Sequence, residues 1–192
     1  ISIMSELRTN RIVPRDGLTS GTFSGGGVIQ VKQTVYTGTD SANGNIAVAL
    51  TDFESSFNCA ITPTRSDSKI LVEMAIVFGI TNNNNIIMTR LRRKIASGSF
   101  ADVDGALGAA SDTRYRCTSA TWGRANEYGT ITVPIKYLDS PSTTSACTYS
   151  ISVAHDSGSS AQTIYLNRSS NDGNNSYIPR SISTITLTEI TG

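Results

Sequence analysis

The stretch SKILVEMAIVFGI, residues 68–80, places an apolar side chain at every second position. A period of two indicates a β-strand with one face turned to the core. Toward the end of the stretch the opposite face also becomes apolar, at Ala75 and Val77, so we expect this strand to be covered on both sides there. The residues predicted to form the core face are Ile70, Val72, Met74, Ile76, Phe78 and Ile80.

Shorter patterns of the same kind flank this stretch, separated by clusters of Gly, Asn, Asp and Ser that favour turns. No segment has a convincing helical period, and no repeat of fixed length is visible. Pro134 lacks a backbone N–H, which favours an edge strand or a bulge at 129–139. The further strands predicted are 28–37, 46–50, 57–62, 86–96, 114–121, 129–139, 147–155, 163–168 and 183–190.

Three of these strands have clear alternation. In 28–37, Ile29, Val31 and Val35 alternate with polar residues. In the strands 129–139 and 147–155, the predicted inward residues are Ile131, Val133, Ile135 and Tyr137, and Cys147, Tyr149, Ile151 and Val153.

The composition supports an all-β fold. Hydrophobic residues make up 38% of the 192 residues and charged residues 16%, against about 45–50% and about 25% in an average globular chain. Val, Ile, Thr and Tyr favour a pleated surface, whereas little Leu, Glu or Lys is present to favour helices. We therefore predict an antiparallel β-sandwich, jelly-roll-like, of about eight to ten strands over residues 28–192.

Charge and apolar runs exclude two classes of partner. The net charge is +1, which gives no strong field toward nucleic acid or an anionic membrane. The longest apolar run, at 75–80, is far too short to span a bilayer, and the first residues do not resemble a signal peptide.

In TRLRRKIAS, Arg90, Arg92 and Lys94 fall on one strand face and Arg93 on the other. Because no aromatic platform accompanies them, a solvated or intersubunit face is favoured over nucleic-acid binding.

The three cysteines, Cys59, Cys117 and Cys147, are odd in number and have no CxxC spacing. This argues against a disulfide framework and against a zinc site. Each lies in or beside a predicted strand, so we expect buried thiols in a protein made in a reducing cytosol.

The sequence contains no specific catalytic or metal-binding motif. The single histidine, His155, ends a strand beside Asp156 and Ser157, but neighbours on a turn do not aim their side chains at one another. DVDG at 102–105 lacks the later ligands of an EF-hand, so a plain turn is favoured there. We predict no catalytic residue, no metal site and no cofactor.

A carbohydrate-binding surface is the one ligand site that the residues leave open. Its candidates are aromatic side chains near loops rich in Asn and Asp. The alternative is that these aromatic residues pack at the sheet ends with their polar tips in water. They are Trp122, Tyr115, Tyr128 and Tyr177.

The first 27 residues form a separate segment. They hold two clusters of glycine and serine, Pro14 and mixed charges, and they end in Gly25, Gly26 and Gly27. We interpret residues 1–27 as an extended anchoring arm with a glycine hinge.

Self-association is predicted from neutral outward rows of the expected strands. Hydroxyl side chains in place of charges would suit packing of identical sheets, which favours a homo-oligomer. The rows are Thr148, Ser150 and Ser152, and Thr184, Thr186 and Thr188.

Three stretches carry a resemblance to a known group of proteins: GGGVIQVKQTVYT, ITPTRSDSKILVEMAI, and IKYLDSPSTTSACTYSISV with YLNRSSND and RSISTITLTEI. Together with the leader SELRTNRIVPRDG, they resemble small virion structural or tail-fibre-like proteins of marine and cyanobacterial tailed bacteriophages. The resemblance carries no catalytic motif.

The resemblance implies a non-enzymatic virion protein, a homotrimer assembled in the host bacterial cytoplasm. Residues 1–27 would bind other phage virion proteins, on a capsid decoration or on a tail fibre or its adaptor. Loops 81–85, 98–113 and 169–178 would face solvent. The alternative function is a receptor-binding module that recognises a host cell-surface glycan.

Overall fold

The computed structural model describes residues 27–43, 50–81, 85–122, 127–156 and 162–191. The predicted arm, except for Gly27, and nearly all of the predicted strand 46–50 lie outside these residues. The described strands are β1 (Val28–Tyr36), β2 (Asp40–Ala42), β3 (Thr51–Asp52), β4 (Cys59–Ile61), β5 (Lys69–Ile80), β6 (Ile86–Ile95), β7 (Ala101–Asp102), β8 (Ser119–Trp122), β9 (Ile131–Asp139), β10 (Cys147–His155), β11 (Ile164–Leu166) and β12 (Ser183–Ile190). A single 3₁₀ turn, Asp104–Ala106, is the only helical element among the described residues.

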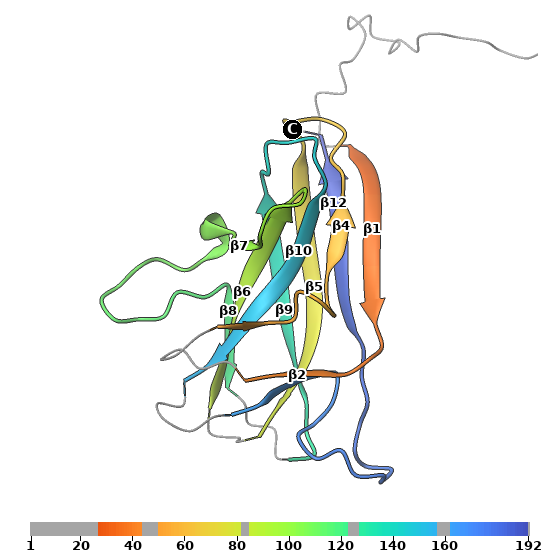
Figure 1. Cartoon of the computed structure of the whole chain (residues 1–192), viewed down its shortest axis with the longest axis vertical. Helices are drawn as coiled ribbons and strands as arrows, with labels where there is room; N and C mark the ends of the chain where they lie inside the picture. The colour runs from red at the N-terminus through yellow and green to blue at the C-terminus, as the bar shows by residue number, and fades with distance from the viewer. Residues whose placement is uncertain (1–26, 44–49, 82–84, 123–126, 157–161, 192) are drawn as a thin grey trace, which may run out of the picture.

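The first sheet is built around β5. This strand pairs with β9 along one edge, and with β12 and then β11 along the other edge. β1 extends the sheet beyond β12, and β2 extends it beyond β11. All of these pairings are antiparallel, and β1 and β9 form the two long edges (Figure 1).

The second sheet is built around β10 and β6. These strands pair over nine residues, from Cys147 opposite Ile95 to His155 opposite Ile87. β3 and β4 lie along the free edge of β10, and β7 and β8 lie along the free edge of β6.

The connections make the sandwich a jelly roll. In chain order, β1, β5, β9 and β12 belong to the first sheet, whereas β4, β6, β8 and β10 belong to the second. Early strands pair with late ones, β1 with β12 and β4 with β10, as expected when Greek keys wrap two sheets around one core. This confirms the predicted fold class.

The core lies between the sheets and follows the predicted alternation. All six core residues predicted for β5 are buried, from Ile70 to Ile80. In β9 and β10 the predicted inward residues are also buried, with two exceptions. Ile131 and Tyr137 are half-buried and pack against the margin of the core. Phe53 and Phe78 stack in the centre with ring centroids 6.3 Å apart.

The far end of β5 is covered on both sides, as predicted. Val77 is buried on the outer side, and a methyl group at Gly79 would meet the Arg168 carbonyl and would lie 2.9 Å from Ser169 Cα. Glycine is required at this position because another segment of backbone lies directly against the strand.

The predicted and observed strands differ mainly in short edge pieces. β2, β3 and β7 have two or three residues each and were not predicted. The strand predicted at 114–121 begins only at Ser119, and the one at 57–62 is reduced to Cys59–Ile61. Pro134 lies in the edge strand β9, which confirms the prediction made from its missing N–H.

One of the two predicted neutral rows is not on the surface. Ser150 and Ser152 on β10 are buried, and Ser150 Oγ donates to the Phe57 carbonyl at 2.7 Å. Their cross-strand partners are Arg92 and Arg90, whose long side chains lie on the same outer side. The prediction of an outward neutral row on β10 was therefore wrong.

β1 presents its apolar residues to solvent. Val31 and Val35 lie on the outer side and are exposed, whereas Gln30 points inward. The inward polar side chain is explained by Glu189, a fully buried carboxylate on β12. Glu189 accepts hydrogen bonds from Gln30 Nε2 at 2.6 Å and from Thr64 N and Oγ1 at 2.7 and 2.8 Å.

These bonds fix the ionised form of Glu189. Burial by itself would raise its pKa, but the hydrogen bonds that Gln30 and Thr64 donate hold the pKa below the ordinary value of 4.5. Glu189 thereby joins β12 to β1 and to the loop between β4 and β5.

We expect Glu189→Gln to lower the free energy of unfolding at pH 7 by about 1–3 kcal/mol, because a buried charged acceptor is replaced by an amide. The folded-state pKa lies below the unfolded one, so the contribution is complete above about pH 4.5 and is lost as the pH falls through the folded value. Urea unfolding at pH 7 and at pH 3 measures both effects.

The control is Asp67→Asn, which removes the exposed pair with Arg65 and should change stability by less than about 1 kcal/mol. A gap between wild type and Glu189→Gln that stays constant from pH 7 to pH 3 would contradict this account.

Candidate functional site

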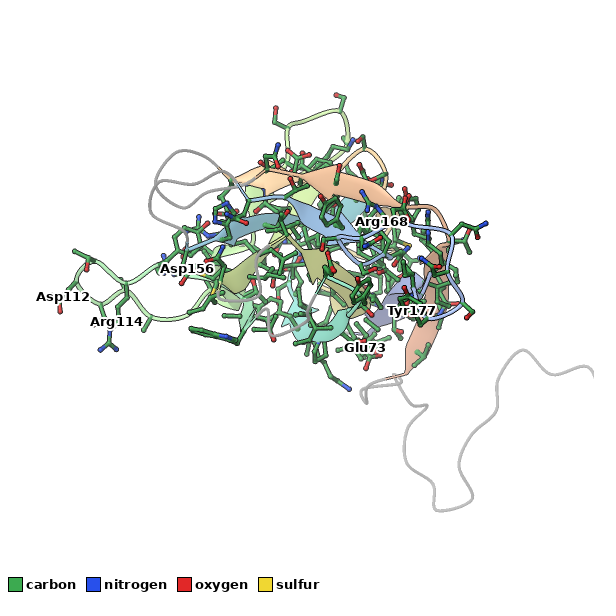
Figure 2. All side chains as sticks on the ribbon, turned by 90° about the horizontal axis from the view of Figure 1, so that it is seen from below. Glu73, Asp112, Arg114, Asp156, Arg168 and Tyr177 are labelled. Atoms are coloured by element: carbon green, nitrogen blue, oxygen red, sulfur yellow. The ribbon has the colours of Figure 1, made fainter. Side chains whose placement is uncertain are left out.

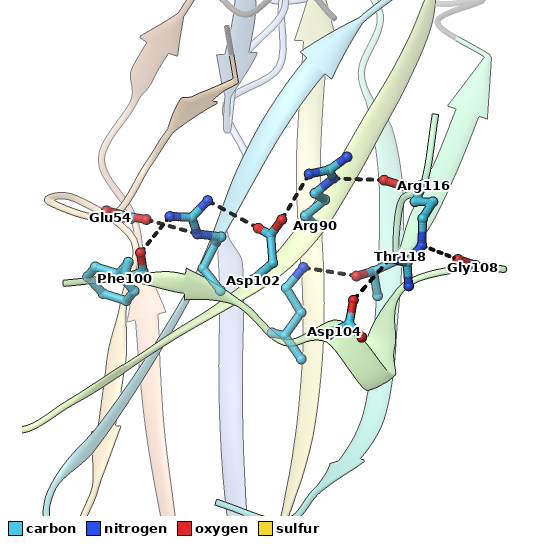
Figure 3. Close-up of polar contacts among 10 residues, drawn as sticks. Glu54, Arg90, Phe100, Asp102, Asp104, Gly108, Arg116 and Thr118 are labelled. Carbon is cyan, nitrogen blue, oxygen red and sulfur yellow. Dashed lines mark hydrogen bonds and ion pairs between the residues drawn. The ribbon is translucent and has the colours of Figure 1, made fainter. Parts of the chain in front are cut away.

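The basic residues of β6 do not form a free basic surface. Arg90 and Arg92 both bind Asp102, through Nη1 at 2.8 and 3.1 Å (Figure 3). Arg92 also pairs with Glu54 at 3.4 Å and donates to the Phe100 carbonyl at 2.8 Å. We call Arg90, Arg92, Asp102 and Glu54 the arginine cluster.

The arginine cluster holds the long segment between β6 and β8 against the second sheet. Arg90 Nε donates to the Arg116 carbonyl at 2.7 Å, and Arg116 in turn binds Asp104 at 3.0 Å and the Gly108 carbonyl at 2.7 Å (Figure 3). Lys94 lies over the Phe100 ring at 4.9 Å. The prediction of a solvated face for Arg90, Arg92 and Lys94 was wrong, because these half-buried cations contact the chain's own loop, whereas the alternative of an intersubunit face stays a prediction.

The same contacts explain the role of the two aspartates of DVDG at 102–105. Asp102 is bound by two guanidinium groups and Asp104 by a third, and the 3₁₀ turn begins at Asp104. Beyond the turn the segment projects from the sandwich, and Figure 2 shows Asp112 and Arg114 at its far tip.

Arg93 points the other way, into the sandwich. It binds the nearly buried Asp139 of β9, and Tyr149 Oη donates to the same carboxylate at 2.7 Å. Burial, together with the Asp139 charge, raises the pKa of Tyr149 well above its ordinary value, so its phenol stays protonated and remains a donor. These three residues link β6 and β10 to β9 across the layers.

His155 is buried at the end of β10, and its Nε2 accepts a hydrogen bond from the Gln162 N–H at 3.3 Å. Burial lowers the pKa of His155 below 6.5, although the Asp156 charge opposes this, so the ring favours its neutral form. Asp156 accepts from the Ile86 N–H at 2.7 Å. Both side chains bind neighbouring backbone, and Ser157 lies outside the described residues.

The cysteines follow the prediction in large part. Cys59 and Cys147 are buried free thiols, and Cys117 is a half-buried one. Burial raises the pKa of Cys117 and of Cys147, which favours the unreactive protonated form. Within the described ranges, no group of three or more His, Cys, Asp or Glu side chains could hold a metal ion.

A cluster of loops lies at the end of the sandwich where β1 finishes. Its centre is Asn167, whose Nδ2 donates to the Tyr36 and Gly38 carbonyls at 2.7 and 2.9 Å. Asn167 Oδ1 accepts from Ser183 Oγ at 2.6 Å. The side chain of Asn167 thus fixes both ends of the segment between β11 and β12.

This segment carries a polar cavity and an aromatic pair. The cavity, of about 230 Å³, is lined by Asp172, Gly173, Asn174, Asn175, Ile178 and Arg180. Beside it in the chain, Tyr177 is 63% exposed and meets Tyr128 edge-to-face, with ring centroids 5.4 Å apart. Amide, carboxylate and guanidinium groups beside an exposed aromatic ring can bind neutral hydroxyl-rich ligands.

The four aromatic candidates do not form one surface. Tyr115 lies under Arg90, whose guanidinium carbon is 4.3 Å from the ring centroid, and its hydroxyl is buried. Trp122 is 47% exposed at the end of β8, opposite Ile86, whose N–H binds Asp156. Figure 2 places Asp156 well apart from Tyr177. The structure therefore brings together only Tyr128 and Tyr177.

Sequence reasoning missed the polar residues that organise this fold. From the sequence, no structural role was assigned to Asp139, Asn167 or Glu189. For Glu189 a signal exists, because it falls on the inward phase of STITLTEI with Ile185 and Leu187. Asn167 gives no such signal in the sequence. Its unusual backbone, with a positive φ of 63°, is visible only in the structure.

No helix among the described residues has the length and apolar character needed to cross a membrane. No protein-family model matches the sequence, and the search of curated proteins finds no match.

Solved structures of infectious bursal disease virus are similar at a low level. Virus-derived T=1 particles match with a TM-score of 0.45 and 11% identity over 93% of this chain and 41% of that chain. A VP2 subviral particle matches with a TM-score of 0.41 and 8% identity over 93% and 43%. The chain spans less than half the length of these solved chains. Values this low assign neither a family nor a function.

We expect Asp102→Asn to release the base of the segment between β6 and β8, because two guanidinium groups lose their shared charge. The Val103 N–H, which bonds the Leu91 carbonyl at 3.0 Å, should exchange with solvent about tenfold faster or more, corresponding to ~1.4 kcal/mol of local stability. Hydrogen exchange measures this directly.

The control is Asp67→Asn, which removes the exposed pair with Arg65 and should leave Val103 exchange unchanged. Equal protection of Val103 in wild type and Asp102→Asn would show that the arginine cluster does not hold the segment.

Proposed function

We propose that the chain is a non-enzymatic structural component of a bacteriophage virion. In this proposal residues 28–192 are a self-assembling β-sandwich module, and residues 1–27 attach it to other virion proteins of a capsid decoration, a tail fibre or a fibre adaptor. The number of copies implied by the sequence resemblance is three, and assembly takes place in the host bacterial cytoplasm.

The observation that carries this proposal is that the chain enters the sandwich at one end and that the loop cluster lies at the opposite end. At one end, the Gly27 N–H donates to Thr191 Oγ1 and the Thr191 N–H donates to the Gly27 carbonyl, both at 3.1 Å. At the other end, Asn167 binds the Tyr36 carbonyl. β1 separates the two ends by about 25–30 Å, at about 3.3 Å per residue (Figure 1). A module held at Gly27 would present the loop cluster outward.

The use of buried polar groups also supports a structural role. Asp139 binds Arg93 and Tyr149, and Glu189 binds Gln30 and Thr64. His155 accepts from a backbone N–H. Each of these titratable groups joins two parts of the fold, which is the function of polar groups in a scaffold.

The proposal is tested on purified particles of the phage that encodes the chain. We expect mass spectrometry to find the full chain in the particles, and a chain lacking residues 1–26 to fold but fail to join them. Keeping Gly27 preserves its bonds to Thr191, and circular dichroism of the truncated chain checks the strand content.

Absence of the full chain from the particles would overturn the virion proposal. Equal incorporation of the truncated chain would overturn the attachment through the first residues and leave the virion role intact.

A second candidate function is recognition of a host surface glycan, favoured by the Tyr128–Tyr177 pair beside the polar cavity. The cavity lining offers two amides and a carboxylate–guanidinium pair, Asp172 with Arg180 at 2.5 Å. These groups lie at the end away from Gly27, where a particle-bound module would meet a cell.

For this candidate we expect Tyr177→Ala to weaken binding to host-surface glycan by about tenfold, or ~1.4 kcal/mol. The matched control is Trp122→Ala, an exposed aromatic residue on β8 that should leave binding unchanged. A glycan array read with both variants measures the difference. No saturable binding by the wild-type chain, or an equal loss in both variants, would rule out this site.

A further inference from the structure

The outer side of the first sheet forms a continuous face across four strands. The register of β1, β12, β5 and β9 aligns their outward side chains in rows across the sheet. We call this surface the outer face. Its rows are Val31, Thr188, Leu71 and Leu138; then Gln33, Thr186, Glu73 and Lys136; then Val35, Thr184, Ala75 and Pro134.

The two flanking rows are largely apolar and open to solvent. Val31 is 55% exposed, and Leu138, at the opposite edge of the same row, is 50% exposed. In the third row, Val35, Ala75 and Pro134 are all exposed. Exposed apolar side chains in contiguous rows mark an interaction surface, whereas single ones do not.

The middle row makes the outer face electrically neutral. Glu73 and Lys136 are cross-strand neighbours and pair at 2.8 Å, and Gln33 Nε2 donates to Thr186 Oγ1 at 2.9 Å. One position beyond Leu71 on the same side of β5, Lys69 lies opposite Ile190 and donates to Ser140 at 2.9 Å. Figure 2 shows Glu73 at the lower margin of the molecule, on the outside of the sheet.

The neutrality of the outer face indicates the partner. A face without net charge gives a charged polymer no attraction, and two copies of it do not repel one another. Each copy also presents one anion and one cation, which a second copy can complement. The three rows span five residues on each of four strands about 4.8 Å apart, which gives roughly 320 Å² in projection before side-chain relief is added. A standard interface takes about 800 Å² of accessible surface from each partner, so the three rows supply the centre of such a contact and not all of it.

We infer that the outer face is the contact surface between copies of this chain. This deepens the self-assembly in the proposed function, and it replaces the predicted row on β10 with a surface that the structure leaves exposed. The retained part of the prediction is the row Thr184, Thr186 and Thr188, which lies in the centre of the outer face.

The test is sedimentation velocity of the full chain and of the double variant Val31→Lys with Leu138→Lys. Because both residues are exposed, lysine is compatible with the folded monomer, but it would be buried without a partner in an assembly. We expect wild type to assemble at micromolar concentrations and the double variant to dissociate roughly 30-fold more readily or to stay monomeric.

The matched control is Trp122→Lys, which makes the same kind of change on the second sheet and should leave assembly unchanged. Circular dichroism and thermal unfolding check the fold of each variant. If the lysine pair does not fold, Val31→Thr with Leu138→Thr removes apolar surface without charge and should still weaken assembly several-fold.

A wild-type chain that stays monomeric at high concentration would overturn the inference and leave the outer face to another partner. Assembly of the double variant equal to wild type would overturn it too, by placing the contact elsewhere. The particle assay is separate: a chain that joins particles as a monomer defeats only this inference, and a chain that self-associates but never enters particles defeats only the virion proposal.

Discussion

The structure depends on the burial of one face of β5 along its whole length. Every second residue from Ile70 to Ile80 is excluded from water, and this fixes the phase of the strands that pair with β5 on either edge. A slip of one residue would turn that face to solvent and bring Glu73 into the core, so the register is strongly determined. The second sheet then closes the core through Phe53, Tyr149 and Ile151.

Period-two alternation made the long strands predictable, because their side chains report directly on which face is buried. The short strands β2, β3 and β7 gave no such signal, since two or three residues cannot show a period. The serines of β10 and the arginines of β6 were misassigned because loops cover them. Ser150 donates to the Phe57 carbonyl in the segment between β3 and β4, whereas Arg90 and Arg92 bind the segment between β6 and β8.

The candidate sites were less predictable than the fold. Aromatic residues near polar loops could be picked out, but only the folded chain shows that Tyr115 lies under Arg90 and that Tyr128 meets Tyr177. The apolar residues of β1 were visible in the sequence as an alternating row. Gln30 donates a hydrogen bond to the buried Glu189 and therefore lies on the inner side of β1. Because side chains alternate along a strand, Val31 then points outward. Long-range polar contacts of this kind leave little trace in local sequence.

The bonds between Gly27 and Thr191 have an architectural consequence. They bring the first and last described residues of the sandwich together at one point of its surface. Domains whose ends are neighbours tolerate insertion into a loop of another protein. They also tolerate circular permutation, in which the old ends are joined and the chain is opened at another loop. Such a unit can be placed within a longer polypeptide without spacers, because its two connections leave side by side.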